Sequence, residues 1–312
     1  MVPLHVVFTN KGAEGRNNDF YAGQIKFDYT ILQGGLLQRF LILRNLLKTS
    51  ECKEVILGGW DSVEQFLGAF LSSTKRNSLI VESTINESSI VGVKAFIKKL
   101  FLKRISKVYS AGELHSMLVK SLGFKKDIII SGGCGLLNYV DQPPFVARQE
   151  VKRFLFVGRL IDVKNLPLLI RVFNTMPDLS LTIIGFGEEE EKLKSIANNN
   201  IQFLGSIANM ELYSYYREAD VFVLPSKSET WGLVVEEALN NGLPVIVSDR
   251  VGCQKDLVTK ETGIVFDYTS EESLRNAIMK MTDKVFYNNL RRGVANLDFN
   301  KRAQVQIECF VN

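Results

Sequence analysis

The stretch ADVFVLPSKSETWGLVVEEALNNGLPVIVSD, residues 219–249, decides the fold of this chain. It reads as an apolar strand (VFVLPS), a polar loop, a helix (GLVVEEALNNG) and a second apolar strand (PVIVSD). Strands that alternate with helices favour parallel β-α-β packing, and strands that are apolar throughout favour a sheet covered on both faces. The stretch therefore predicts a doubly wound α/β domain.

The same alternation extends upstream to Arg153. Apolar strands (RFLFVG, SLTIIGFG, IQFLG) alternate with helices (LPLLIRVFNTM, EEEEKLKSIANN, NMELYSYYREA), and the first half of the chain is similar but less regular (LHVVFTN, EVILGGW, NSLIVES, KVYSAG, DIIISGG). Paired prolines in QPPF, residues 142–145, mark a linker. We therefore expect two doubly wound parallel-sheet domains facing across a cleft. Ligands should bind beyond the carboxyl ends of strands, after Asn10, Gly158, Gly185 and Ser226.

Composition excludes several classes of protein. The 312 residues are 46% hydrophobic and 23% charged, which is ordinary globular composition and fits two domains. No apolar run approaches the ~20 residues of a membrane-spanning helix, and the N-terminal run is too short for a signal peptide. The two histidines, His5 and His115, exclude a histidine-rich metal site. The cysteines lie far apart, which predicts reduced thiols and a cytoplasmic protein: Cys52, Cys134, Cys253 and Cys309.

Positive charge is concentrated in the first half of the chain. Residues 1–150 hold 19 Lys and Arg against 13 Asp and Glu, although the whole chain carries only +4. VKAFIKKLFLKRISKV, residues 93–108, has the spacing of an amphipathic helix. Its apolar side comprises Val93, Phe96, Ile97, Leu100, Phe101, Ile105 and Val108, and its basic side Lys94, Lys98, Lys99, Lys103 and Lys107. The helix either contacts an anionic membrane or packs on the core with a solvated outer face; no reading motif supports nucleic acid.

Two strand ends in the second half carry residues suited to phosphate. Gly158-Arg159 and Lys164 follow one strand, and a guanidinium with an ammonium group suits a diphosphate, although such pairs are often plain surface charge. Gly185 and Gly187 follow the next strand. Glycines there permit close approach of the backbone to a ligand, and a tight turn explains them equally well.

The loop from Ser226 to Glu237 is the richest in chemistry. A helix begins near Gly232, and the exposed N–H groups at a helix start attract anions. Glu229 lies in the loop and Glu237 in the helix, so only the loop geometry can bring both carboxylates to one ligand. Either glutamate alone is explained equally well as surface charge around a capped helix.

Taken together in order, these motifs resemble the nucleotide-binding half of family-4 retaining glycosyltransferases, which have the GT-B fold. The resemblance covers about Arg153 to Met281 and includes an E-x7-E element at Glu229 and Glu237. The first half is similar, more loosely, to a bacterial branch of the family. Many members carry a histidine where IVEST has Glu82, so Glu82 either takes part of its role or supports the fold.

The resemblance implies transfer of a sugar from a nucleoside-diphosphate donor to a saccharide or lipid-linked acceptor, with retention, in surface polysaccharide synthesis. It implies an acceptor domain at 1–149, completed by 297–312, and a donor domain at 150–296. Arg159, Lys164 and the helix start would receive the diphosphate, Glu229 the sugar and Glu237 the ribose. No metal or other cofactor is expected, and no D-x-D motif is obvious. The implied donor site comprises Gly158, Arg159, Lys164, Gly185, Gly187, Gly205, Ile207, Ser226, Glu229, Thr230, Trp231, Gly232, Leu233 and Glu237.

Three other readings remain open at this stage. The chain could be a catalytically silent family member that serves as a binding or partner subunit. It could be another GT-B enzyme, such as a nucleotide-sugar epimerase. A dinucleotide oxidoreductase is disfavoured because no G-x-G-x-x-G opens a helix after a strand.

Overall fold

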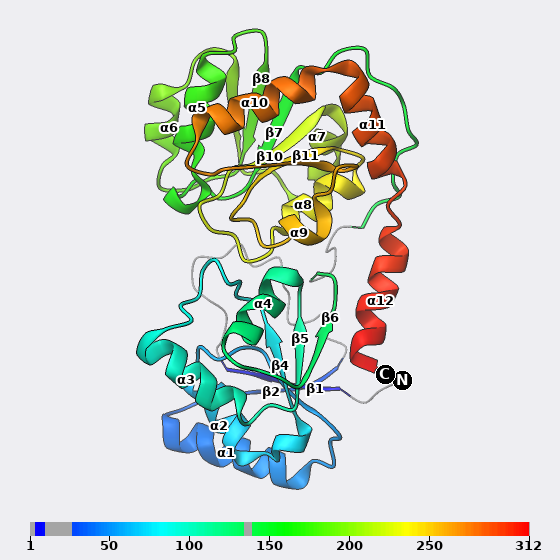
Figure 1. The fold of residues 1–312 in the computed structure, drawn as a ribbon. Coiled ribbons are helices and arrows are strands. Elements are labelled where there is room, and N and C mark those ends of the chain that lie inside the picture. The colour runs from blue at the N-terminus through cyan, green and yellow to red at the C-terminus, as the bar shows by residue number, and fades with distance from the viewer. Residues whose placement is uncertain (1–3, 10–26, 134–138, 312) are drawn as a thin grey trace.

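A computed structural model describes residues 4–9, 27–133 and 139–311 of the chain. Asn10 and Cys134 therefore lie outside the described residues. The described chain forms two α/β domains stacked one above the other, with a long C-terminal helix along one side (Figure 1). This is the GT-B arrangement expected from the sequence.

The C-terminal domain is built on a six-stranded sheet whose strands are all parallel, as expected. The strand order is β12-β11-β10-β7-β8-β9. Its strands are β7 (Arg153–Val157), β8 (Ser180–Ile184), β9 (Ile201–Gly205), β10 (Val221–Leu224), β11 (Val245–Ser248) and β12 (Gly263–Phe266). The chain winds outward from β7 to one edge and then returns to β10 on the other side. The two strands at this switch point therefore diverge in their connections and leave room for a ligand beyond their carboxyl ends.

Helices cover both faces of this sheet. They are α5 (Leu166–Asn174), α6 (Glu190–Ile196), α7 (Leu212–Glu218), α8 (Leu233–Asn240), α9 (Gln254–Leu257), α10 (Glu271–Thr282) and α11 (Lys284–Ala295). Every residue of β10 and β11 is buried, and Phe154, Phe173 and Phe222 are almost wholly removed from solvent. The uniformly apolar strands are thus explained by a sheet that has no wet face.

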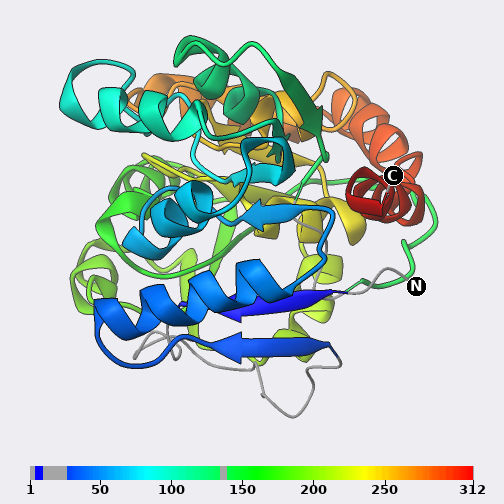
Figure 2. The same cartoon turned by 90° about the horizontal axis from the view of Figure 1, so that it is seen from below.

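The N-terminal domain is divided between two sheets. A parallel sheet has the order β3-β4-β5-β6, formed by β3 (Val55–Leu57), β4 (Asn77–Val81), β5 (Lys107–Ser110) and β6 (Asp127–Ile130). The strands β1 (His5–Phe8) and β2 (Asp28–Ile31) pair separately, both pointing the same way (Figure 2). The surrounding helices are α1 (Leu36–Thr49), α2 (Val63–Leu71), α3 (Gly92–Leu102) and α4 (Glu113–Ser121). We expected a single doubly wound sheet in this domain. In the structure no hydrogen bonds join the β1-β2 pair to the four-stranded sheet among the described residues.

The basic amphipathic helix is shorter than the 93–108 expected. Helix α3 ends at Leu102, and Lys107 and Val108 belong to β5. The N–H of Ser106 donates to the carbonyl of Asn77 (2.8 Å), which directs the chain toward the sheet next to β4. Ile105, just before β5, and Val108, within it, are both fully buried, so they are apolar because they pack in the core of the domain rather than because they lie on one face of a helix.

Much of the apolar face of α3 is exposed. Val93, Phe96 and Ile97 are 75%, 60% and 43% exposed, whereas Ala95 and Phe101 pack inward. Lys98, expected on the solvated basic side, donates to the Ser88 hydroxyl (2.8 Å) and lies over the Trp60 ring. A helix that buried its whole apolar side in the core would not expose these side chains, so packing on the core explains only part of the apolar pattern of α3.

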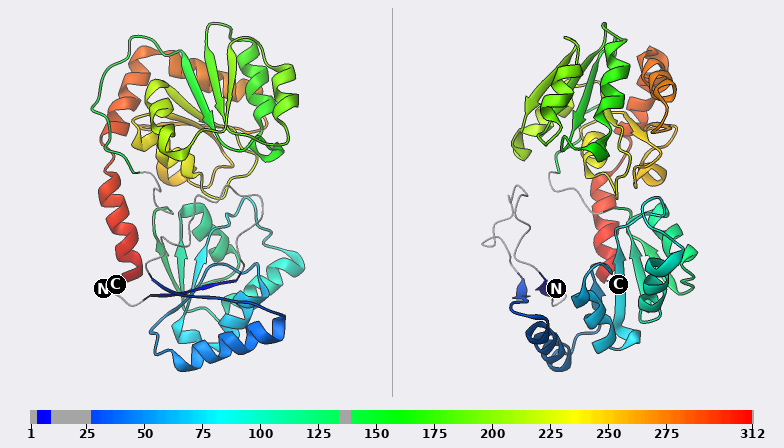
Figure 3. Two further views of the ribbon diagram at one scale, coloured as in Figure 1. Left: turned by 180° about the vertical axis from the view of Figure 1, so that it is seen from behind. Right: turned by 90° about the vertical axis from the view of Figure 1, so that its left-hand side faces the viewer.

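The C-terminal helix α12 (Phe299–Val311) runs from the second domain to the first (Figure 3). Its Phe310 ring lies 4.5 Å from that of Tyr109 in β5, and Arg302 donates to the carbonyl of Gly132 (2.6 Å). The segment 297–311 therefore contacts the N-terminal sheet through both an aromatic pair and a hydrogen bond.

The two domains also meet where α4 begins. The N–H of Glu113 donates to both carboxylate oxygens of Asp256 in α9 (3.0 and 3.1 Å), so a residue of one domain caps a helix of the other. A Cβ on Gly112 would lie 2.3 Å from the Asp256 carboxylate and 2.7 Å from the Trp231 ring. A larger residue at this position would have to displace both side chains, so glycine favours the close contact between the domains.

Two further findings concern the expected class of protein. In the part of the chain that is described, no helix has the length and apolar character needed to cross a bilayer. Cys52, Cys253 and Cys309 are free thiols, as expected for the three that can be placed.

Candidate functional site

A pocket of about 180 Å³ opens beyond the carboxyl ends of β7, β8 and β9, beside the switch point at β7. It is lined by Val157, Gly158, Arg159, Ile184, Gly185, Phe186, Ser206 and Ile207. Four of these residues, Gly158, Arg159, Gly185 and Ile207, were expected at a ligand site. Residues from three separate strand ends are thus collected at one sheet edge, where a doubly wound fold binds its ligand.

The glycines of the pocket are explained by packing between loops. A Cβ on Gly185 would lie 1.8 Å from the carbonyl oxygen of Gly158, and one on Gly187 would lie 2.3 Å from that of Leu160. Gly205 has a positive φ of 69°, and its carbonyl accepts from the N–H of Gly185 (2.8 Å). The loops after β7, β8 and β9 therefore touch through their backbones, and the close approach is first of all to one another.

Arg159 and Lys164 differ in what they contact. Arg159 is exposed at the pocket, and among the described residues no carboxylate pairs with it. Lys164 lies in a short 3-10 turn that ends at Asn165, whose φ of 55° is left-handed. The Lys164 side chain is only 13% exposed, and it forms an ion pair with Glu229.

The Lys164–Glu229 pair joins the loops that follow β7 and β10. Glu229 is held by its backbone: its N–H donates to Arg250 (3.2 Å), and its carbonyl accepts from Gly252 (2.8 Å). The fold therefore brings together two side chains 65 residues apart that the sequence placed in one site. Each charge of this pair neutralises the other, and a diphosphate bound there would compete with Glu229 for Lys164.

Glu237 lies on α8, below the loop. The Tyr216 hydroxyl donates to its Oε2 (3.0 Å), and burial raises the pKa of Glu237 above its usual value while that hydrogen bond opposes the rise. Burial similarly raises the pKa of the neighbouring Glu236. Tyr216 therefore orients the carboxylate that was expected to receive a ribose.

The helix start and the residues around it lie as the sequence indicated. Gly232, with a φ of 99°, precedes Leu233, the first residue of α8. Ser226 is fully buried, and its carbonyl accepts from the Ser248 hydroxyl (2.5 Å). The backbone of Thr230 lies next to Gly252.

Trp231 lies away from this pocket, at the contact between domains. It is 3% exposed, its Nε1 donates to Glu236 (2.9 Å), and its ring lies 5.7 Å from that of His115 in α4. His115 is fully buried, and burial lowers its pKa to about 4, an effect that backbone groups of Thr230 and Glu82 partly oppose. The side chain of Trp231 thus packs the domains together.

On the N-terminal side, Glu82 is exposed in the loop that follows β4. A second glutamate of the same loop, Glu87, accepts a hydrogen bond from the Ser228 hydroxyl (2.9 Å). Sequence analysis missed both Glu87 and Ser228. Ser228 stands directly before Glu229 and could have been noted, whereas no spacing identifies Glu87, because only the contact between domains places it.

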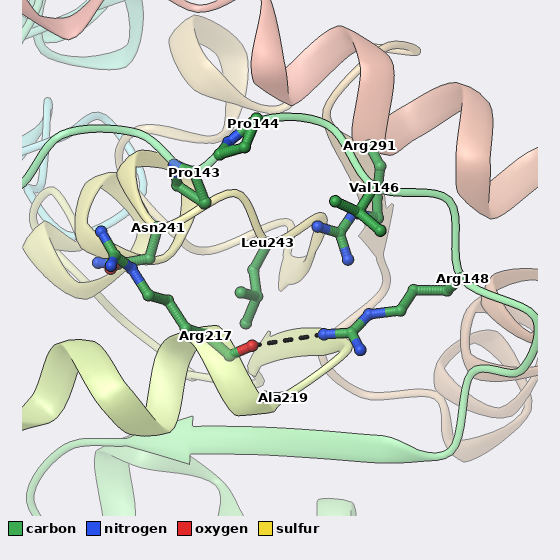
Figure 4. A pocket seen from close by; sticks show the side chains of 9 residues that line it. All are labelled: Pro143, Pro144, Val146, Arg148, Arg217, Ala219, Asn241, Leu243 and Arg291. Carbon is green, nitrogen blue, oxygen red and sulfur yellow. Dashed lines mark hydrogen bonds between the residues drawn. The ribbon is translucent and has the colours of Figure 1, made fainter.

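A larger pocket of about 290 Å³ is not part of this site (Figure 4). It lies between the linker and the C-terminal domain, and Arg148 there donates to the Arg217 carbonyl (3.4 Å). Ala219 and Leu243 line it and stand just before β10 and β11, at the amino ends of the strands. The switch-point pocket lies at the opposite edge of the sheet, so size alone is a poor guide to the site.

Comparison with known proteins agrees with this geometry. The sequence model of the family described as glycosyl transferases group 1 matches residues 141–293. The O-antigen biosynthesis glycosyltransferase WbnH of Escherichia coli is 33% identical over 178 residues, which are 55% of this chain and 48% of that protein. A sulfoquinovosyl transferase of Arabidopsis thaliana is 37% identical over 118 residues, or 36% and 23% of the two chains. The chain thus matches about half or less of these curated relatives.

Solved structures resemble the whole chain. The apo lipopolysaccharide outer core galactosyltransferase WaaB superposes with a TM-score of 0.73 at 12% identity, covering 97% of this chain and 98% of that one. Anabaena HepE, in complex with UDP and glucose, gives a TM-score of 0.70 at 15% identity and covers 98% and 99%. At such low identity these likenesses establish the fold alone. They show that this chain has the GT-B fold, and residues 141–293 within that fold match the glycosyl transferases group 1.

Proposed function

We propose that this chain transfers a sugar, with retention, from a nucleoside-diphosphate donor to a hydroxyl of a saccharide or lipid-linked acceptor. The observation that carries the proposal is that the Lys164–Glu229 ion pair joins the loops after β7 and β10, while Arg159 lines the pocket beside it. Glu237 lies on α8, the helix that follows the loop of Glu229. Family members that act in O-antigen synthesis, such as WbnH, support a role in surface polysaccharide.

Each side chain has a chemical task in this proposal. The departing nucleoside diphosphate gains negative charge as the glycosidic bond lengthens, so Arg159 and Lys164 stabilise the transition state more than the bound donor. When the diphosphate draws Lys164 away, Glu229 is freed to accept hydrogen bonds from the sugar and to oppose positive charge at its anomeric carbon. Glu237 accepts the ribose hydroxyls, for which the two oxygens of a carboxylate are suited.

The proposed reaction needs no divalent metal, because Arg159 and Lys164 supply the positive charge at the diphosphate. Among the described residues no group of three or more metal-ligating side chains is close enough to hold an ion. Turnover should persist in excess EDTA, and a requirement for added Mg²⁺ or Mn²⁺ would refute this part of the proposal.

The first experiment is a calorimetric titration with UDP, GDP, ADP and dTDP on the wild type, Arg159→Ala and Glu237→Ala. We expect one nucleotide to bind, and both substitutions to weaken it by about 1–3 kcal/mol, the usual loss for a hydrogen bond to a charged group. If no nucleotide binds the wild type, or if binding ignores both substitutions, the donor site is wrong.

The second experiment separates an enzyme from a silent partner subunit. The sugar nucleotides of the base identified above are incubated with the protein and simple glycoside acceptors, and the released nucleotide and the anomeric configuration of the product are followed by NMR. Retention with release of the nucleotide supports transfer. Tight nucleotide binding without any turnover, with acceptor or with water, favours the silent subunit.

We also propose that α3 contacts an anionic membrane, which would bring the protein to a lipid-linked acceptor at the inner face of the cytoplasmic membrane. The exposed Val93, Phe96 and Ile97 offer apolar side chains to the lipid, and the exposed Lys94 and Lys99 offer charge to its head groups. A basic, partly apolar surface of this kind binds through burial of apolar area plus attraction to anionic lipid.

Vesicle sedimentation tests this contact. Binding to vesicles with anionic lipid should exceed binding to neutral ones, and it should fall with Phe96→Ser and with the double variant Lys94→Gln/Lys99→Gln. Lys260→Gln, an exposed lysine of the other domain, is the control. Equal binding to both kinds of vesicle, or none, would contradict the proposal.

A further inference from the structure

The loop between β4 and α3 crosses to the other domain at two points beside the candidate site. The Ser228 hydroxyl donates to Oε1 of Glu87 (2.9 Å), and the Asn86 side chain donates to the carbonyl of Asp249 (3.3 Å). The loop is held internally by the buried Thr84, whose hydroxyl accepts from the N–H of Asn86 (3.2 Å). Glu87 therefore occupies a defined place opposite the loop that carries Glu229.

Burial and a nearby like charge both disfavour the charged form of Glu87, which hydrogen bonds from a bound ligand would stabilise. Partial burial raises the pKa of Glu87; the hydrogen bonds from Ser228 and from the N–H of Thr84 lower it, and the charge of Glu229 raises it again. Lys164 already pairs with Glu229, so it does not offset the charge of Glu87 directly. Like charges held near one another cost free energy, and a structural contact to one hydroxyl does not require a carboxylate.

Glu87 also keeps free hydrogen-bonding capacity. A carboxylate has about four acceptor positions, of which Ser228 occupies one and the N–H of Thr84, at 3.4 Å, a second and weaker one. The residue as a whole remains exposed, so its other positions are open to a molecule in the space between the domains. Paired acceptor positions of this kind suit the hydroxyl groups of a sugar.

The geometry points to Glu87 as a specificity-determining residue that accepts hydrogen bonds from hydroxyls of the transferred sugar. This inference rests on the proposed function. The sugar is joined to the diphosphate near Lys164 and Glu229, and Glu87 faces that position from the N-terminal domain. Because Glu87 comes from one domain and the nucleotide site from the other, the sugar is gripped only when the domains are closed.

Glu82, at the position where many family members carry histidine, is the alternative carboxylate. It stands five residues earlier, is exposed, and no hydrogen bond from its side chain to the C-terminal domain is present among the described residues. The carboxylate that contacts the C-terminal domain is therefore that of Glu87, which the turn at Thr84 holds in place. The structure thus assigns the role to Glu87.

The test compares the affinity for a nucleoside diphosphate with the affinity for its sugar nucleotides. The probes are UDP with UDP-glucose, UDP-galactose and UDP-N-acetylglucosamine, or GDP with GDP-mannose if GDP is the nucleotide that binds. The proteins are the wild type, Glu87→Gln, Glu82→Gln and the control Glu51→Gln, an exposed glutamate elsewhere in the N-terminal domain. Calorimetry gives each dissociation constant.

We expect Glu87→Gln to leave the nucleoside diphosphate affinity within about twofold and to weaken the preferred sugar nucleotide by about tenfold, the size of one lost charge-assisted hydrogen bond. The unchanged nucleoside diphosphate affinity also reports an intact fold. Equal weakening of both ligands would overturn the inference, because Glu87 would then act only on domain closure. An effect of Glu82→Gln alone would overturn it as well. If the wild type binds no nucleotide, the proposed function itself fails.

Discussion

The two domains of this protein differ in how deeply some of their strands are buried. In the C-terminal domain β10 and β11 are buried along their whole length, whereas β1, β2 and β6 of the N-terminal domain have no fully buried residue. The buried sheet presents its pocket on short loops that touch through glycine backbones. The more exposed half contributes side chains from longer loops, such as Glu87. In the proposed function, the nucleotide binds to the more buried domain, and the more exposed domain contributes contacts to the sugar and acceptor.

The largest expected effect tests whether the buried sheet is the stable half. Phe222→Ala in β10 removes a fully buried ring and should lower the free energy of unfolding by about 3–5 kcal/mol, because the cavity cannot close. Phe96→Ala on the exposed side of α3 should change it by less than about 0.5 kcal/mol. Urea unfolding measures both. Similar losses for the two variants would remove the contrast between the halves.

The next effect concerns the charges of the pocket. Lys164→Ala should lower the transfer rate about 10²–10³-fold, the usual loss when one donor to developing negative charge is removed. Lys192→Ala, an exposed lysine of the same domain paired with Glu189, is the control and should leave the rate unchanged. Steady-state kinetics with saturating donor measures the loss. A change below about threefold would place the diphosphate elsewhere.

A smaller effect follows from the raised pKa of Glu237. Burial favours its protonated form, and a ribose hydroxyl binds the charged form better, so affinity for the nucleotide should fall as the pH drops. The loss should begin at a higher pH than the ordinary value of 4.5 would give. Calorimetry from pH 8 to about pH 5 on the wild type and Glu237→Gln separates this group from the titration of the ligand itself. Parallel curves for the two proteins would exclude Glu237.

The smallest effect tests the contact that joins the two halves. Asp256→Ala removes the cap that the C-terminal domain places on α4. The closed arrangement of the domains should become about 1 kcal/mol less stable relative to an open one. Small-angle scattering should then show a larger radius of gyration than for the wild type. Asp178→Ala, an exposed acid in the same domain, is the control. An unchanged scattering curve would mean that other contacts hold the domains together.

The sequence was most reliable where local signals agree with the fold. In the C-terminal half each apolar run ends in glycine or a polar loop and is followed by a helical pattern, so its strands and helices could be read in order. The same patterns misjudged residues 93–108, because Ile105 and Val108 continue the helical spacing, although Val108 belongs to β5 and Ile105 precedes it. Tertiary pairing with β4 decided between the two.

The sequence by itself determined the doubly wound C-terminal domain, the order of its motifs and four of the eight residues that line the pocket. These depend on periodicity and on strand ends that must meet at one sheet edge. Only the tertiary structure decided that Lys164 pairs with Glu229, that Trp231 packs between the domains, and that Glu87 faces the site. These contacts join residues far apart in the chain, and no local pattern encodes the distance between two loops.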